Sequence, residues 1–206
     1  MRMRKCLSVV MILSGLLCVI AALGLTAYNL ITERNAGAAS KVAMVSISET
    51  AGKTQSTDAA AQLLVQPLYQ IDPNVSMPET KVNGVKYIGS LNIPALGLEL
   101  PIITETTGAL LQVAPCRLSG SAYLEDLVIG AHNYTTHFGN LKKLQYGDVV
   151  EFTDMDGNTF TYEVAGMEIL QPDQLEDLCS GEYPLSLYTC TIGGRTRLTV
   201  RCVEVE

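Results

Sequence analysis

The feature that most constrains this chain is a run of 27 residues without a charge, from Cys6 to Thr32. A helix needs about 20 such residues to cross the hydrocarbon layer of a membrane. Three positive charges precede the run, and positive residues favour the cytoplasmic side. We therefore expect a cytoplasmic tail at 1–5 and a single transmembrane anchor at 6–32, with everything after it outside the cell.

A cleaved signal peptide is the competing interpretation of the same segment. Residues 36–39 are small, as a cleavage site requires. The apolar stretch of a signal peptide usually has about 7–15 residues, and this run is longer. The length favours an uncleaved anchor, and both interpretations export the rest of the chain.

The charge distribution excludes one class of partner. The chain carries a net charge of −7, but residues 1–40 carry +3, which leaves −10 on residues 41–206. A segment with this negative charge repels the phosphate backbone of nucleic acids, and we expect no nucleic-acid binding. With only two histidines, His132 and His137, there is little room for a histidine-rich metal site.

The composition and the hydrophobic pattern of the sequence change near residue 85. Ser, Thr, Ala, Gln and Gly dominate residues 36–61, and three prolines follow before residue 79. This composition predicts a weakly structured extracytoplasmic linker over 33–84. Short β-rich runs separated by turn residues then fill 85–206, which we expect to be one folded domain.

At least seven short β-segments are expected in this domain, with little helical periodicity. Short helices are possible at 139–146 and 173–178. The spacing favours an antiparallel sandwich or a closed barrel. The expected strands are 87–94, 98–103, 127–131, 148–153, 159–165, 185–190 and 197–205.

Two strand ends carry side chains suited to nucleophilic chemistry. Cys190 ends an apolar run before a Gly-Gly turn, and His132 ends another. A free thiol has a pKa of about 8.5, and a nearby imidazole or guanidinium lowers it. Arg195, Arg197 and Arg201 follow within eleven residues. The alternative is that the cysteine is a packed core residue and the histidine a turn residue, and spacing alone does not decide between them.

Four motifs, in order along the chain, resemble those of the sortase family. The run 87–94 resembles the opening strand, and 128–133 (Val-Ile-Gly-Ala-His-Asn) resembles the histidine motif. The run 185–190, ending in Tyr-Thr-Cys, and the run 197–201 (Arg-Leu-Thr-Val-Arg) resemble the active-site strand pair. The resemblance covers about 84–206 and implies a mainly β fold: a closed barrel of about eight strands with short helices, preceded by one transmembrane helix.

The resemblance also implies roles for individual residues. Cys190 corresponds to the nucleophile, which attacks the Thr–Gly bond of an LPXTG-like sorting signal to form a thioacyl enzyme. His132 corresponds to the acid/base, and Arg197 to the arginine that holds the substrate and stabilises the oxyanion. Thr189 and Asn133 are expected to support the site.

The arginine assignment leaves alternatives, because Arg195, Arg197 and Arg201 share one strand parity. Arg197 is preferred since it opens the strand before Leu-x-Val, as in the family. Arg195 in the turn is the second choice, and Arg201 is expected to be an outward strand residue. His137 lacks the strand-end context of His132, so we expect it at the surface.

The resemblance further implies partners and location. The substrates would be surface proteins with C-terminal sorting signals and an amine on a peptidoglycan precursor or pilin, with the enzyme held in the cell membrane. Some sortases bind calcium through carboxylates near the groove, but acidic loops are usually solvated, so no metal or cofactor is expected. An extracellular cysteine peptidase that mainly hydrolyses, and a non-catalytic anchored β-domain, remain the alternatives.

Overall fold

A computed structural model describes residues 2–62 and 66–205, with side chains described for 11–48 and 66–205. Residues 1, 63–65 and 206, which belong to the expected tail, linker and domain, lie outside the described residues. The chain divides into two compact units, Met1–Asn35 and Ala36–Glu206. Each is described by itself.

The first unit is the beginning of a long helix, α1 (Arg2–Gln62). Within the described residues, one helix is long and apolar enough to cross a membrane, and an 18-residue window within its Met11–Ser48 stretch has a mean hydropathy of 2.1. Its large apolar side chains from Met11 to Ile31 are exposed. Since exposed apolar surface is unfavourable in water, this confirms the expected apolar N-terminal helix as a candidate membrane span.

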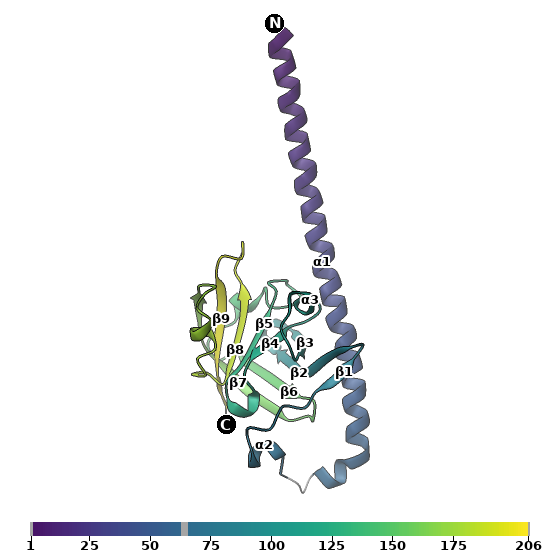
Figure 1. Cartoon of the computed structure of the whole chain (residues 1–206), viewed down its shortest axis with the longest axis vertical. Helices are drawn as coiled ribbons and strands as arrows, with labels where there is room; N and C mark the ends of the chain where they lie inside the picture. The colour runs from purple at the N-terminus through teal and green to yellow at the C-terminus, as the bar shows by residue number, and fades with distance from the viewer. Residues whose placement is uncertain (1, 63–65, 206) are drawn as a thin grey trace. The chain divides into compact units, whose positions relative to one another are not determined.

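The second unit is built on a sheet that closes on itself (Figure 1). In the described part of the chain nine strands follow the order β1-β2-β3-β4-β5-β8-β9-β7-β6, and β2 also pairs with β6. Eight strands therefore form a closed barrel with β1 appended, which confirms the expected barrel. The strands are β1 (Thr80–Val82), β2 (Val85–Ile93), β3 (Leu98–Ile103), β4 (Cys116–Ser119), β5 (Leu127–Ala131), β6 (Val149–Asp154), β7 (Thr159–Leu170), β8 (Leu185–Cys190) and β9 (Arg197–Glu204).

Short helices occupy the connections between these strands. The expected helices at 139–146 and 173–178 appear as the single turns η3 (Leu141–Lys143) and α4 (Leu175–Leu178). The short helices are α2 (Leu68–Ile71), α3 (Gly108–Leu111), α4 (Leu175–Leu178) and the 3₁₀ turns η1 (Pro94–Leu96), η2 (Ala122–Leu124) and η3 (Leu141–Lys143).

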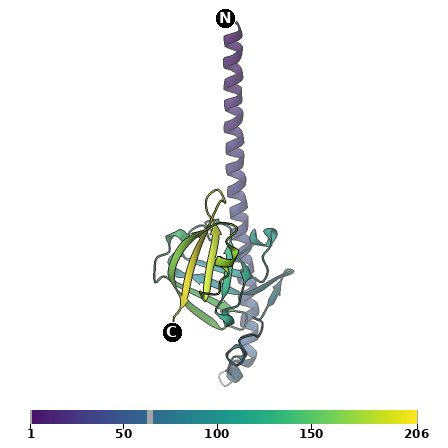
Figure 2. The same cartoon turned by 60° about the vertical axis from the view of Figure 1, so that its left-hand side comes forward.

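The strand pattern alone favoured antiparallel pairing, but the observed sheet contains parallel pairs as well. The pairs β3–β4 and β5–β8 are parallel, while the other pairings are antiparallel. Parallel neighbours end at the same edge of a sheet, so the carboxyl ends of β5 and β8 lie side by side. Figure 2 shows β7, β8 and β9, in green to yellow, as neighbours in one wall of the barrel.

Alternate residues of the strands fill the barrel. Ile88, Leu91, Ile129 and Leu187 have no exposed surface and belong to one apolar cluster. Each such side chain contributes about 1.5–3 kcal/mol by leaving water. Gly89 is required where β2 meets β6, because a Cβ there would collide with the backbone of β6.

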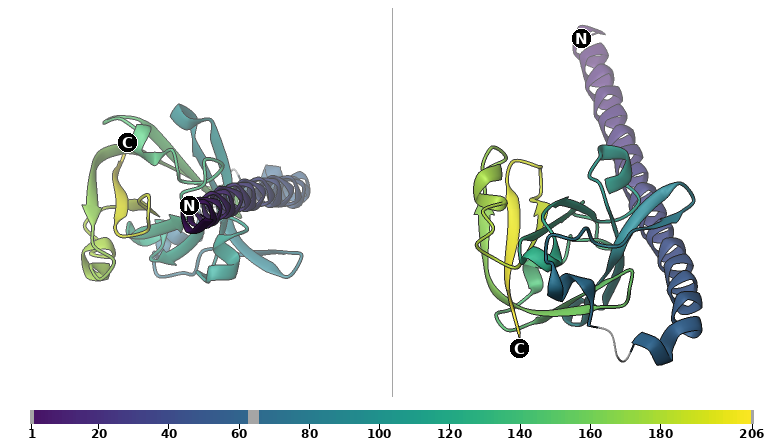
Figure 3. Two further views of the ribbon diagram at one scale, coloured as in Figure 1. Left: turned by 90° about the horizontal axis from the view of Figure 1, so that it is seen from above. Right: turned by 60° about the horizontal axis from the view of Figure 1, so that its bottom comes forward.

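A weakly structured linker was expected over 33–84. In the structure, residues 36–62 are helical instead and continue α1. Ala36, Ser40, Ala43 and Ile47 are buried at spacings of four, three and four residues, which is one face of a helix. Ala43 and Ile47 pack with an apolar cluster from β2, β3 and β4. This part of α1 runs beside β1 (Figure 3).

A buried polar contact accompanies this packing. The Ser40 hydroxyl donates to the Val113 carbonyl at 2.7 Å and lies 3.0 Å from His137 Nε2. His137 has no exposed surface, so the expectation that it is a surface residue is wrong. The helix covers it, which the isolated loop sequence does not reveal.

Replacing Ser40 by alanine tests whether α1 is part of the folded domain. Ser40→Ala removes the hydroxyl that contacts buried His137, so we expect the free energy of unfolding to fall by about 1–2 kcal/mol. Ser48→Ala is the matched control, because Ser48 is exposed and bonds only within the helix. Denaturant unfolding of the full chain in detergent measures both. Equal stability of the two variants would contradict the packing.

Candidate active site

The strand register aligns the three residues expected to be catalytic. Parallel pairing sets Ala131 of β5 beside Thr189 of β8, and His132 and Cys190 are the residues that directly follow this last pair. Antiparallel pairing sets Cys190 directly opposite Arg197 of β9. Neighbouring strands are about 4.8 Å apart, so Cys190 and Arg197 lie side by side. Continuing the β5–β8 register by one residue would place His132 in the same row.

A side-chain hydrogen bond fastens the strand ends together. The Thr189 hydroxyl donates to the Ala131 carbonyl at 2.9 Å, between residues that directly precede Cys190 and His132. Thr189 is buried, at 3% exposure. The contact therefore fixes β8 against β5 where the row of three begins.

Cys190 opens into a cleft of about 740 Å³. The thiol-bearing residue is exposed rather than packed in the core. The lining comes from the segment after β5, from η3 and from the ends of β7, β8 and β9, and it includes the expected supporting residues Asn133 and Thr189. The arrangement leaves the nucleophile candidate accessible beside polar and apolar side chains.

The segment after β5 is folded tightly and holds His132 in place. The Phe138 amide donates to the His132 carbonyl at 3.2 Å, and the Phe138 ring is fully buried in the core. The Gly139 amide donates to the Tyr134 carbonyl at 2.8 Å. A Cβ at Gly139 would collide with the backbone of Asn133 and Tyr134, so only glycine fits.

The His132 ring is half-buried, with its centroid 5.0 Å from that of Tyr134. Desolvation by burial lowers the pKa of His132 below its ordinary value. Burial disfavours the charged imidazolium, so the neutral ring predominates at neutral pH. The described residues show no hydrogen bond from His132 to Cys190, and catalytic hydrogen bonds often tighten only when substrate is bound.

Arg197 lies on the same face of the sheet as Cys190. Its Nη1 donates to the Pro172 carbonyl at 2.6 Å, and its guanidinium lies 5.8 Å from the centre of the Tyr188 ring. A side chain at Gly130 would collide with that ring, so the glycine in the neighbouring strand makes room for Tyr188. The guanidinium is thus held over β8 beside the cleft.

The register separates Arg197 from the second choice, Arg195. The Thr191 amide donates to the Thr196 carbonyl at 2.9 Å, which closes a turn with Arg195 inside it. Gly193 and Gly194 have φ angles of 86° and 69°, a left-handed conformation that favours glycine. Arg195 therefore lies in the turn and has no cross-strand partner in β8.

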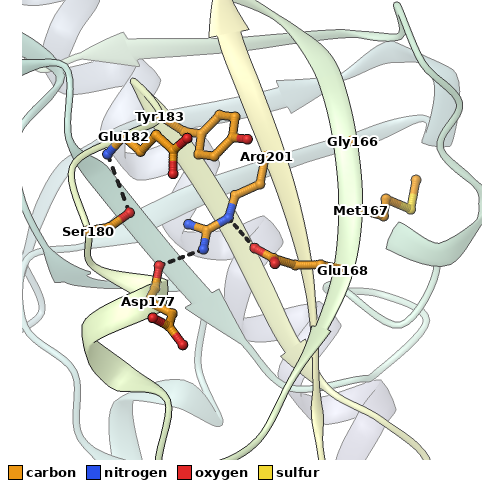
Figure 4. A pocket seen from close by; sticks show the side chains of 8 residues that line it. All are labelled: Gly166, Met167, Glu168, Asp177, Ser180, Glu182, Tyr183 and Arg201. Atoms are coloured by element: carbon orange, nitrogen blue, oxygen red, sulfur yellow. Dashed lines mark hydrogen bonds and ion pairs between the residues drawn. The ribbon is translucent and has the colours of Figure 1, made fainter.

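Arg201 points outward from the barrel, as expected, but it is only 6% exposed. Its guanidinium donates to Glu168 Oε1 at 2.6 Å, to Ser186 Oγ at 2.8 Å and to two carbonyls of the α4 segment. Figure 4 shows Arg201 between Glu168 of β7 and the α4 segment, in a second hollow of about 430 Å³. This network pins the β7–β8 connection, which also contains the Pro172 carbonyl that Arg197 contacts.

The other cysteines outside the apolar helix are placed differently from Cys190. Cys116 and Cys202 are buried, and burial raises the pKa of each thiol to about 12. Cys179 is exposed at the end of α4, where its sulfur accepts from the Ser119 hydroxyl at 3.3 Å. Cys202 belongs to the apolar cluster that fills the barrel.

Comparison with known proteins agrees with this geometry. The sortase domain family model matches residues 91–205. Sortase A of Bacillus anthracis is 31% identical over 115 residues, which cover 50% of this chain and 51% of that protein. The chain thus spans about half the length of the curated relative that it matches.

Solved structures share the fold. Sortase C1 of Streptococcus suis is 27% identical with a TM-score of 0.50, covering 58% of this chain and 73% of that chain. A Clostridium perfringens sortase D5 transpeptidase is 22% identical with a TM-score of 0.54, covering 68% and 94%. The likeness at 22% identity is evidence for the fold alone.

The Thr189 contact provides a test of the strand alignment. Thr189→Val keeps the shape but removes the hydroxyl, so we expect a loss of about 1 kcal/mol in the free energy of unfolding. Thr189→Ser retains the donor and is expected to lose less. Denaturant unfolding of the full chain compares the variants, and a valine variant as stable as wild type would show that the bond does not hold the strands.

Proposed function

The chain belongs to the sortase family, and we propose that it is a membrane-anchored cysteine transpeptidase. The observation that carries the proposal is the exposed Cys190 at an open cleft, directly opposite Arg197 in the register and one residue beyond the pair Ala131–Thr189, which His132 follows. The donor substrate would be a surface protein with an LPXTG-like sorting signal. The acceptor would be an amine on a cell-wall precursor or a pilin.

The reactive form has passed the Cys190 thiol proton to His132, so that a thiolate stands with an imidazolium. In the first step this thiolate attacks the carbonyl carbon of the Thr–Gly bond. A carbon–sulfur bond forms, and the carbonyl electrons move to oxygen to give a tetrahedral oxyanion. The oxyanion collapses, the carbon–nitrogen bond breaks, and His132 supplies the proton that the leaving amine needs. The product is a thioacyl enzyme and a released peptide amine.

In the second step an incoming amine attacks the thioacyl carbon. His132, now neutral, takes the proton that the amine loses, and the cysteine thiolate leaves. An amide bond replaces the thioester, so the net reaction exchanges one amine for another. Burial lowers the pKa of the half-buried His132 imidazole, so the neutral ring that can accept this proton is favoured.

Arg197 would stabilise the oxyanion through charge-assisted hydrogen bonds. Its guanidinium now donates to Pro172, so it would turn from this carbonyl toward the substrate over Cys190. Thr189 would act by holding the two strand ends together, and Asn133 by lining the cleft. The site needs no metal or cofactor for this chemistry.

The apolar helix supports a membrane location. With positive residues before it, we propose a single span, a cytoplasmic N-terminus and a catalytic domain outside the cell. Such an anchor would hold the cleft near substrates that are themselves being exported.

Replacing Cys190 tests the nucleophile. Cys190→Ala is expected to abolish cleavage of sorting-signal peptides and to remove the mass adduct of the thioacyl enzyme. Cys179→Ala is the matched control, since it removes an exposed thiol outside the cleft lining, and it should retain both. Intact-mass spectrometry with a library of LPXTG-like peptides measures the adduct. Turnover by the Cys190→Ala protein would refute the proposal.

The products then separate the two catalytic alternatives. If added glycine-like amines divert the product from acid to amide, the enzyme is a transpeptidase. If the acid persists at high amine concentration, the chain is mainly a hydrolase. A non-catalytic domain would give no adduct, although the exposure of Cys190 favours a working thiol.

The pH dependence provides a further test. A Cys–His pair gives a bell-shaped profile of kcat/KM. The lower of the two apparent pKa values of the pair sets the acid limb, and because burial lowers the pKa of His132 this limb is expected below pH 6.5. Stopped-flow or discontinuous assays from pH 4 to 10 measure it, and a rate that rises monotonically with pH would contradict the pairing.

A further inference from the structure

Positive charge is concentrated around the cleft of an otherwise acidic domain. Residues 85–206 contain 16 Asp and Glu but only seven Lys and Arg. Four of the seven lie at the cleft or at the β8–β9 end beside it: Lys142, Lys143, Arg195 and Arg197. The domain as a whole repels anions, whereas this end of the barrel attracts them.

Lys142 and Lys143 line the same cleft as Cys190, and none of the lining residues is Asp or Glu. Both lysines are exposed. They lie on η3, flanked by the buried side chains of Leu141 and Leu144. Backbone bonds from Lys143 to Asn140 at 2.9 Å and from Leu144 to Leu141 at 3.0 Å close this turn. The backbone that carries the two lysine side chains is therefore held in a fixed position at the rim of the cleft.

Neither lysine forms an ion pair with any residue that the structure describes. Glu168 of β7 precedes Ile169, which lines the cleft, but the Glu168 carboxylate is bound to Arg201 in the second hollow. The positive charge at the cleft is thus not neutralised by the protein itself. A ligand with negative charge would complement it.

We propose that Lys142 and Lys143 make the cleft selective for substrates that carry a carboxylate close to the reacting group. The proposal rests on the proposed function, since it names the substrate class of that site. Two sources supply this chemistry: an acidic side chain of the sorting signal, or a carboxylate beside the amine of the acceptor. Ammonium groups bind either as point charges without strict geometry.

Thiol labelling tests the local charge without any substrate. Iodoacetate and iodoacetamide alkylate the Cys190 thiolate in the same way, with loss of iodide, but only the first is an anion. Site-resolved mass spectrometry of the full chain gives the ratio of the two rates at Cys190. The thiolate fraction cancels in this ratio, so the ratio reports the potential at the cleft.

We expect Lys142→Gln/Lys143→Gln to lower the iodoacetate-to-iodoacetamide ratio about three- to tenfold at about 10 mM salt, where the Debye length is about 30 Å. The decrease should largely vanish at about 1 M salt, where that length is about 3 Å. Lys142→Glu/Lys143→Glu should lower the ratio further. The iodoacetamide rate shows whether each variant is folded with an accessible thiol.

Lys41→Gln/Lys81→Gln is the matched control. Both residues are exposed lysines outside the cleft lining, and the change in net charge is the same. The ratio at Cys190 should stay near the wild-type value. A control that lowers the ratio as much as the cleft variant, or a cleft variant that leaves it unchanged, would overturn the proposal.

Turnover then identifies the source of the carboxylate. Donor peptides that differ by Glu or Gln beside the sorting motif form one arm, and glycine against glycinamide as acceptor forms the other. If the wild type prefers the carboxylate-bearing member of a pair and Lys142→Gln/Lys143→Gln loses that preference, the arm concerned identifies the source of the carboxylate. If the variant loses no preference in either arm, the proposed substrate class is wrong. Failure of the proposed function is distinct, because no peptide would then acylate Cys190 while the labelling ratio still changed.

Discussion

The parallel pairing of β5 with β8 is the constraint on which the site depends. It brings two carboxyl-terminal strand ends to one edge, and the antiparallel pairing of β8 with β9 adds the start of a third strand. A slip of one residue in either pairing would turn Cys190 to the opposite face of the sheet. The buried bond from Thr189 to Ala131 opposes such a slip where it would matter most.

Two elements outside the barrel steady this edge. On one side, Arg201 holds the β7–β8 connection through hydrogen bonds to the carbonyls of Asp177 and Leu178, and the Pro172 carbonyl of that connection holds Arg197. On the other, α1 packs Ser40 against His137 in the segment that follows His132. Breaking a buried polar network leaves several groups unsatisfied, so each contact makes the loops around Cys190 costly to displace.

Much of this fold could be predicted from the sequence, because apolar runs bounded by turn residues mark strands clearly. The segments 127–131 and 185–190 were predicted with their observed bounds. The order of the motifs placed Cys190 and His132 at strand ends, and the register supports Arg197 over Arg195. The spatial meeting of the three could not be derived from spacing, since it depends on which strands pair and in which direction.

The features that were missed depend on tertiary packing. The stripe at Ala36, Ser40, Ala43 and Ile47 has helical spacing, but its small residues resemble a linker in composition. The strand β4 has only four residues, too short for a clear alternation. The burial of His137 requires knowledge of the helix that covers it, and its spacing from His132 carries no such signal.

A cross-link measures the central alignment most directly. In a Cys179→Ser background, which removes a competing exposed thiol, His132→Cys should form a disulfide with Cys190 under mild oxidation, because neighbouring strands bring their Cα atoms within the usual 4.4–6.8 Å or so. Peptide mapping would detect the 132–190 bond. We expect high yield for this variant and little for His137→Cys. The reverse result would show that β5 and β8 do not bring these residues together.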